Sequence, residues 1–239
     1  MQTGLKKRLL DLATEPYRHT GLFNYQWARG KLWGDPIFAA LLERPVLPDG
    51  ARILDLGCGR GLLAAWLLGA ERLAALGEWR TSPAPPTGLR FRGIELMERE
   101  AICGNQALQP LHGERVQLSG GDMRDTELGD TDVIAILDVL HYVSYADQDR
   151  MLDRIRAALS AGGLFVTRIG DADGGMRFAF SQAVDACMAF IQGHRLARMW
   201  CRPLSQWTRA LERRGFAVEA VPMSGGTPFA NIMLIARAT

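Results

Sequence analysis

The residues of this sequence best suited to bind a ligand form a glycine-rich turn. Gly57, Gly59 and Gly61 come directly after a short apolar run at 52–56 (RILDL), and good helix formers occupy 62–76. Glycine permits a tight turn and leaves backbone N–H groups open to a ligand, because it has no Cβ. The order predicts a strand, a ligand-binding turn and a helix.

Acidic residues accompany the predicted strands. Asp55 lies just before the turn, Glu95 lies near the end of the apolar run 91–96, and Asp122 follows further on. In an open α/β sheet the carboxyl ends of the strands face the ligand crevice, and a carboxylate there can accept from two neighbouring hydroxyls. The alternatives are a solvated acid for Glu95, a helix cap for Asp55, and a turn or cap residue for Asp122.

The most promising general base is His141, which follows a predicted strand at 132–137. Its neutral imidazole has an ordinary pKa near 6.5, so it can accept a proton near neutral pH. Tyr142 and Tyr145 share its turn and could shape a binding pocket. The alternative is a structural histidine at a strand-to-helix turn.

The cysteines and histidines do not have metal-binding spacing. No C-x-x-C or H-x-x-x-H pattern occurs among them, so we predict no metal site. The spacings do not suggest a compact disulfide framework either, and reduced thiols are expected. These residues are Cys58, Cys103, Cys187, Cys201, His19, His112, His141 and His194.

The elements that position these residues alternate between strand and helix. Strands are predicted at 52–56, 91–96, 116–118, 132–137 and 164–169, and helices at 62–76, 97–107 and 146–159. Such alternation implies right-handed crossovers and a doubly wound, mainly parallel sheet. After a helix at 204–214, strands at 216–221 and 232–236 are joined by a connection too short for a crossover helix, so they must pair antiparallel.

The remaining segments surround this core within one predicted domain. Residues 1–50 form a helical cap, 51–169 the cofactor-binding core, 170–202 an inserted lid, and 203–239 a C-terminal helix and hairpin. The cap contains an amphipathic helix at 5–13, a helix at 36–42 and a linker at 45–50, and a Pro-rich surface excursion occupies 77–90. Gly170, Gly174 and Gly175 are possible hinges of the lid, which we expect to close with residues 15–45. The alternative is an accessory helix that packs on the core.

Composition and charge exclude several classes of protein. The 239 residues include 28 basic and 26 acidic side chains, a net charge of +2, whereas nucleic-acid binding needs a clustered basic excess. Apolar runs end well before 18 residues, and no signal peptide is evident, so we expect a cytoplasmic protein without a membrane span. The sequence does not indicate an oligomeric state.

Five segments together resemble the class I S-adenosylmethionine-dependent methyltransferases. ILDLGCGRGLLAAWL resembles motif I of that family, and FRGIELME, SGGDMRD, AILDVLHYV and RAALSAGGLFVTRI resemble its later motifs in the same order. The resemblance implies an α/β, Rossmann-like, doubly wound and mainly parallel seven-stranded sheet with an antiparallel C-terminal hairpin and helical cap elements.

The resemblance also implies the cofactor and its ligands. S-adenosylmethionine would bind with Glu95 on its ribose hydroxyls, with Asp122 and Met123 beside its adenine, and with the fourth-strand motif beneath its methyl group. The cofactor residues are Asp55, Gly57, Cys58, Gly59, Gly61, Glu95, Leu96, Asp122, Met123, Leu137 and Asp138.

The methyl acceptor is expected to be a small molecule enclosed by segments outside the core, at 15–45 and 170–200. Aromatic residues there alternate with cationic ones, which suits a flat acid or phenol; the alternative is that the aromatics only pack on the core. The proposed acceptor contacts are Tyr17, Tyr25, Arg29, Tyr142 and Arg168, with His141 as catalytic base; Asp171 lies just past the fifth strand, and Arg177 and His194 belong to the lid.

Two terminal segments are similar to a subgroup of the family. Residues 17–38 and 224–236 resemble methyltransferases encoded with aryl-polyene pigment pathways. This implies an aromatic or thioester-bound aromatic acceptor, free or presented on an acyl-carrier protein, whose acidic surface basic residues would help to dock.

Two other functions compete with methyl transfer. A nicotinamide-dependent oxidoreductase would also use a glycine turn and an acid after the second strand. However, Leu62 stands where the dinucleotide fingerprint needs a small residue, and no Tyr-x-x-x-Lys pair occurs. A non-catalytic cofactor-binding protein of the same fold is also compatible, because methyl transfer requires no invariant catalytic side chain.

Overall fold

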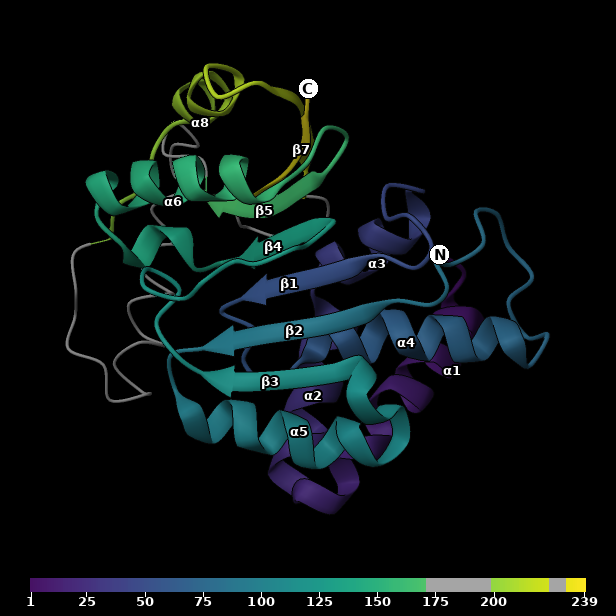
Figure 1. The fold of residues 1–239 in the computed structure, drawn as a ribbon. Helices are drawn as coiled ribbons and strands as arrows, with labels where there is room; N and C mark the ends of the chain where they lie inside the picture. Colours follow the sequence, from purple (N-terminus) through teal and green to yellow (C-terminus); the bar gives the residue numbers. More distant parts are fainter. Residues whose placement is uncertain (171–198, 224–230) are drawn as a thin grey trace. The chain divides into compact units, whose positions relative to one another are not determined.

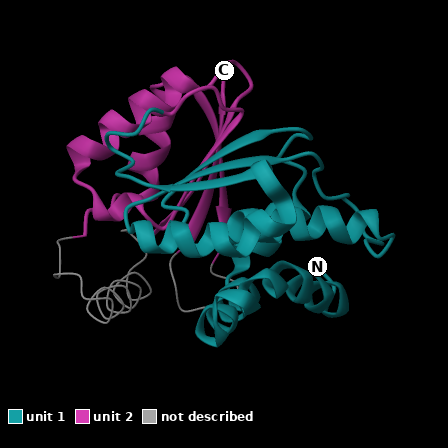
Figure 2. Cartoon of the chain, turned by 60° about the horizontal axis from the view of Figure 1, so that its bottom comes forward, with its two compact units in different colours: residues 1–127 teal, residues 128–239 magenta. Residues whose placement is uncertain are grey.

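The computed structural model describes residues 1–170, 199–223 and 231–239. Seven strands follow the order β3-β2-β1-β4-β5-β7-β6, with helices against the sheet (Figure 1). The predicted doubly wound, mainly parallel sheet with an antiparallel C-terminal hairpin is therefore confirmed. The chain divides into two compact units, residues 1–127 (unit 1) and 128–239 (unit 2) (Figure 2).

Unit 1 contains three parallel strands and two helices that alternate with them. The strands are β1 (Arg52–Leu56), β2 (Arg90–Glu95) and β3 (Val116–Gly120), and the helices are α4 (Leu62–Ala75) and α5 (Glu98–His112). Leu56 is paired with Ile94, and Glu95 with Gly120, so the carboxyl ends of the three strands are aligned. This alignment brings the glycine turn beside Glu95.

The N-terminal elements of unit 1 are helical. They are α1 (Thr3–Thr14), the 3-10 helix η1 (Glu15–Thr20), α2 (Leu22–Gly34) and α3 (Pro36–Glu43). Helix α1 packs on α4, where a Cβ added to Gly69 would lie 3.2 Å from the Cβ of Ala13. The buried indole of Trp66 donates to the carbonyl oxygen of Phe38 at 2.8 Å and connects α4 to α3.

The described residues of unit 2 form four strands. β4 (Val133–Leu137) and β5 (Leu164–Gly170) are parallel, while β7 (Asn231–Ala238) lies antiparallel between β5 and β6 (Phe216–Pro222). The helices among its described residues are η3 (Leu140–Tyr142), α6 (Tyr145–Ala158) and α8 (Leu204–Glu212). In unit 1, η2 (Gly113–Arg115) is a short 3-10 turn. Nearly all side chains of β4 and β5 are buried, as expected for strands covered on both faces.

Several boundaries differ from the predictions. Helix α5 continues to His112, five residues beyond the predicted end, and contains Pro110 in its last turns. Strand β3 continues to Gly120 rather than Leu118. The predicted excursion at 77–90 is confirmed as irregular up to residue 89. Among the described residues, no helix is both long and apolar enough to cross a membrane.

Most of the predicted lid lies outside the described residues. This applies to Asp171, Gly174, Gly175, Arg177 and His194, and to Cys187. The lid and its closure therefore stay predictions.

Candidate functional site

The glycine turn of unit 1 has a left-handed backbone at each of its three glycines. The φ angles are +81° at Gly57, +52° at Gly59 and +76° at Gly61, a region that side chains with a Cβ rarely adopt. The N–H groups of Gly57 and Cys58 donate to the carbonyl oxygen of Ile94 at 2.8 and 3.2 Å. The turn is thus attached to β2, and its conformation explains the spacing of the glycines.

Glu95 is fixed across this turn by two backbone donors. Its Oε2 accepts from the N–H of Gly59 at 2.9 Å, and its Oε1 accepts from the N–H of Met97 at 3.0 Å. The residue is only 9% exposed. Each carboxylate oxygen keeps accepting capacity, because a carboxylate has about four lone-pair positions. Glu95 is therefore oriented before any ligand binds.

Asp55 and Glu95 make the turn electronegative. Burial, with a smaller contribution from the negative charge of Glu95, raises the pKa of Asp55 from 3.8 to about 7. Burial also raises the pKa of the Cys58 thiol well above its ordinary range, with smaller contributions from Asp55 and Glu95. Cys58 is therefore a neutral thiol. A cationic ligand beside Asp55 would favour the ionised form of the Asp55 carboxyl group.

Arg60 supports the turn, a role that the sequence analysis missed. Its guanidinium binds Glu100 of α5 through Nε at 2.5 Å and Nη2 at 3.3 Å. It also lies over the ring of Trp27 at 4.7 Å from the centroid. Its main-chain oxygen accepts the hydroxyl of Tyr17 at 2.7 Å. These long-range partners leave no local pattern in the sequence that could have revealed them.

The contact with Arg60 corrects the prediction for Tyr17. This side chain is fully buried in unit 1, so it packs beneath the glycine turn and does not line an acceptor pocket. Tyr25 is also buried, and its hydroxyl accepts from Arg18 at 2.7 Å and from Arg29 at 3.3 Å. Arg29 is further paired with Asp11 at 2.7 Å. These contacts stabilise the N-terminal helices.

The predicted cofactor residues that follow β2 and β3 differ in their contacts and in their exposure. The side chain of Asp122 accepts from the N–H of Arg124 at 2.8 Å and pairs with its guanidinium, which is the geometry of a turn residue. Met123 is buried, whereas Leu96, directly after Glu95, is 68% exposed. An exposed leucine beside Glu95 suits contact with a flat ligand.

In unit 2, Asp138 and Arg168 form an ion pair where β4 ends. Asp138 has a φ of +60° and is the only non-glycine residue with a positive φ in the described part of the chain. Its Oδ1 accepts from Nε of Arg168 at 2.6 Å, and a second contact joins Oδ2 to Nη2. Leu137, the neighbour of Asp138, is the register partner of Arg168. A strained backbone held by a buried arginine is typical of functional sites.

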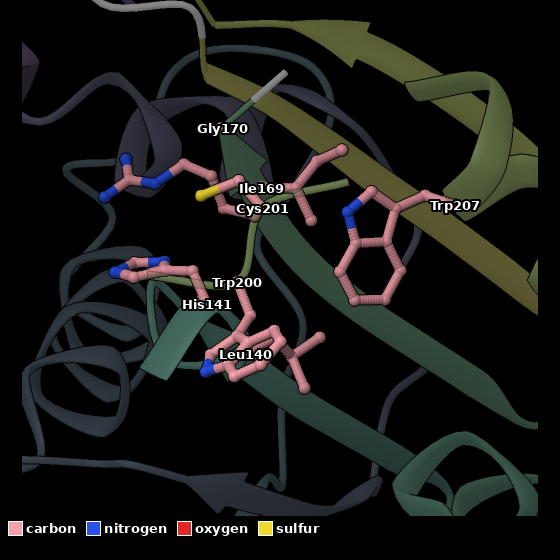
Figure 3. A pocket seen from close by; sticks show the side chains of 8 residues that line it. Leu140, His141, Ile169, Gly170, Trp200, Cys201 and Trp207 are labelled. Atoms are coloured by element: carbon pink, nitrogen blue, oxygen red, sulfur yellow. The ribbon is translucent and has the colours of Figure 1, made fainter. Parts of the chain in front are cut away.

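Beside this pair lies a small pocket that includes His141 (Figure 3). It is lined by Leu140, His141, Arg168, Ile169, Gly170, Trp200, Cys201 and Trp207. Its volume is about 10 Å³, roughly the room for one water, so it must widen to take a larger ligand. The structure thus brings His141 and Arg168 together.

Tyr142 accompanies His141 on the same turn. The two rings have centroids 4.2 Å apart, and Tyr142 is 47% exposed. Trp200, Cys201 and Trp207 were missed as site residues, because they come from a segment distant in sequence and carry no motif.

The chain was compared with known protein families and with curated proteins. A family model described as a methyltransferase domain matches residues 25–221, and the chain belongs to that family. Among curated proteins, a search finds no match.

Solved structures with this fold include several methyltransferases. Mitomycin 7-O-methyltransferase has 24% identity and a TM-score of 0.63, over 96% of this chain and 60% of that one. Magnesium protoporphyrin IX methyltransferase from Synechocystis, with bound S-adenosylhomocysteine, has 16% identity and a TM-score of 0.60, over 92% of this chain and 89% of that one. Human N-acetylserotonin methyltransferase, in complex with S-adenosylmethionine, has 15% identity and a TM-score of 0.60, over 89% of this chain and 53% of that one. The chain thus spans about half of the last protein, and these likenesses concern the fold.

Proposed function

We propose that the chain is an S-adenosylmethionine-dependent methyltransferase that acts on a small aromatic acceptor with an acidic group. The observation that carries the proposal is the Glu95 carboxylate, fixed across the glycine turn by the N–H groups of Gly59 and Met97. Membership of the methyltransferase domain family and the fold support it.

The residues of unit 1 fit the cofactor. Glu95 would accept from the two ribose hydroxyls. The space where Gly59 lacks a Cβ is open, since no described atom beyond its two chain neighbours lies within 4 Å of it. Exposed Leu96 would contact the adenine, and Asp55 would offset the positive charge of the ligand. When bound, S-adenosylmethionine supplies an electrophilic methyl group.

The residues of unit 2 suggest how the acceptor is held. Arg168 would attract a carboxylate or phenolate, and the ring of Trp200 would offer an apolar surface. The imidazole of His141 would accept the proton that an acceptor hydroxyl loses. An acceptor carried as a thioester on an acyl-carrier protein belongs to the same proposal, supported by the similarity of residues 17–38 and 224–236 to aryl-polyene methyltransferases.

Calorimetry with S-adenosylhomocysteine and with nicotinamide dinucleotides tests the cofactor. We expect the first to bind and the others not to bind. Glu95→Ala should weaken binding by about 1–3 kcal/mol, the usual loss for charged hydrogen bonds. The control Glu78→Ala removes a carboxylate that pairs with Arg8 at an exposed position and should leave binding unchanged. Binding of a nicotinamide dinucleotide alone would favour the oxidoreductase.

Turnover tests the reaction itself. Hydroxybenzoates, free and carrier-bound, are offered with S-adenosylmethionine, and methylated product is measured by mass spectrometry. We expect product with at least one of them and a drop of about 10²–10⁴-fold in kcat for His141→Gln. Tight cofactor binding without any product would instead favour the non-catalytic alternative.

A further inference from the structure

We propose that Gln148 is a positioning residue that holds His141 and Trp200 in the pocket of unit 2. The inference rests on the proposed function, because it assumes that this pocket receives the acceptor. Gln148 lies on α6, outside every motif that the sequence analysis identified.

The burial of Gln148 requires an explanation. Its side chain is fully buried, on the face of α6 that also buries Met151, Leu152 and Ile155. An amide among apolar side chains costs free energy unless it is hydrogen-bonded. A residue such as leucine would continue the apolar face at this position, so the amide is expected to have a specific task.

The amide nitrogen of Gln148 contacts three main-chain carbonyl oxygens. Nε2 lies 2.9 Å from the oxygen of Leu140, 3.2 Å from that of Val143 and 2.7 Å from that of Trp200. An amide has two hydrogens, so one of them is shared between two acceptors. The first two carbonyls flank the turn that carries His141, and the third belongs to Trp200, which also lines the pocket.

A fourth hydrogen bond closes this arrangement. The N–H of Trp200 donates to the main-chain oxygen of His141 at 2.8 Å. The N–H of Trp200 is thus hydrogen-bonded to the turn that carries His141, and its carbonyl oxygen is hydrogen-bonded to the amide of Gln148. Both residues line the pocket, as Figure 3 shows, so the amide determines how the imidazole and the indole are placed.

The neighbouring contacts limit what the loss of Gln148 would disturb. The hydroxyl of Tyr145 donates to the oxygen of Cys201 at 3.0 Å, and the guanidinium of Arg202 pairs with Asp149 at 2.8 Å. These bonds would still hold the segment after Trp200 on α6. We therefore expect a local displacement of His141 and Trp200.

Gln148→Met tests this inference, because methionine has a similar length and no donor. The matched control is Thr131→Val, which removes a buried hydroxyl that donates to the oxygen of Val133 at 2.9 Å, elsewhere in unit 2. The emission of Trp200 is measured by difference. The fluorescence spectrum of each protein with the additional substitution Trp200→Phe is subtracted from the spectrum of the same protein with Trp200 intact. The kcat, the KM for the acceptor and the Kd for S-adenosylhomocysteine are measured alongside.

We expect the emission of Trp200 to shift to the red in Gln148→Met and not in Thr131→Val. The kcat should fall about tenfold to a hundredfold, the scale of a misplacement near 1 Å, while the Kd for S-adenosylhomocysteine stays within about twofold. If Gln148→Met does not fold, Gln148→Asn keeps the amide one methylene shorter and should give a smaller change in the same direction.

Two results would overturn the inference: an unchanged Trp200 emission in Gln148→Met, or a kcat that falls no more than in Thr131→Val. The fluorescence comparison does not need an acceptor. If no acceptor is ever methylated, the proposed function fails on turnover, while the emission of Trp200 still decides whether Gln148 positions it.

Discussion

At the scale of single residues, the glycine turn combines fixed geometry with concentrated negative charge. Glu95 accepts from two backbone donors, while Asp55 is buried beside it with its pKa raised to about 7. Burial is the main cause of the raised pKa of Asp55, because it disfavours the charged carboxylate, and the nearby charge of Glu95 acts in the same direction.

The raised pKa of Asp55 makes stability depend on pH. Its folded value of about 7 exceeds the ordinary 3.8, so the folded state binds the extra proton between these values. The contribution of Asp55 to stability is therefore present below about pH 4 and is lost as the pH rises through 7. About three pKa units correspond to an upper bound of roughly 4 kcal/mol.

We therefore expect Asp55→Asn to be more stable than the unchanged protein at pH 8, with the difference shrinking towards pH 4. Urea unfolding at a series of pH values measures this difference. Glu114→Gln, at an exposed acid of unit 1, is the control and should show no such trend. A pH-independent difference for Asp55→Asn would contradict the assignment.

At the scale of elements, the close approach of α5 to the glycine turn is a condition of the site. A Cβ added to Gly104 would lie 2.7 Å from the main-chain oxygen of Arg60 and 2.4 Å from Cδ1 of Leu118. Arg60 and Glu100 bind α5 to the same turn. The position of the turn therefore depends on a small residue in the helix.

Gly104→Ala should destabilise the protein by about 1–3 kcal/mol through overpacking and weaken the binding of S-adenosylhomocysteine. Gly30→Ala, in α2, is the matched control, because beyond the adjacent residues and the backbone of the helix itself no described atom lies within 4 Å of the added Cβ. Alanine favours helices, so the control should be up to about 1 kcal/mol more stable. Equal changes in the free energy of unfolding for the two substitutions, measured with urea, would show that α5 can accommodate the added methyl group.

At the scale of the whole molecule, ligand binding and folding are linked by mass action. S-adenosylhomocysteine at a hundred times its Kd should stabilise the folded chain by about 2.7 kcal/mol. Differential scanning calorimetry with increasing ligand should show a rising unfolding temperature, and nicotinamide dinucleotides should have no effect. A constant unfolding temperature would contradict a cofactor site in the folded protein.

The chain order of unit 2 has a further consequence at this scale. β7 is formed by residues near the C-terminus, yet it lies between β5 and β6. Its antiparallel pairing on both sides makes the sheet of unit 2 depend on the last residues described. The short connection between 222 and 231 had predicted from the sequence only the pairing of β6 with β7, not that of β7 with β5.

The sequence by itself determined the elements whose patterns are local. Strand β1, the glycine turn, α4 and the acid that ends β2 follow from apolar runs, glycine spacing and helix formers within a few residues. Helix α2 was not predicted, because its aromatic residues do not form a regular apolar stripe. The five ordered motifs were enough to indicate the methyltransferase family.

Only the tertiary structure decided which side chains support the site. Tyr17 meets the carbonyl of Arg60, Asp138 meets Arg168, and Gln148 meets Trp200 across distant parts of the chain. Such contacts depend on how the elements pack, and packing is decided by side chains far apart in sequence. The sequence predicted where ligands could bind, while long-range packing determined which buried groups hold those residues in place.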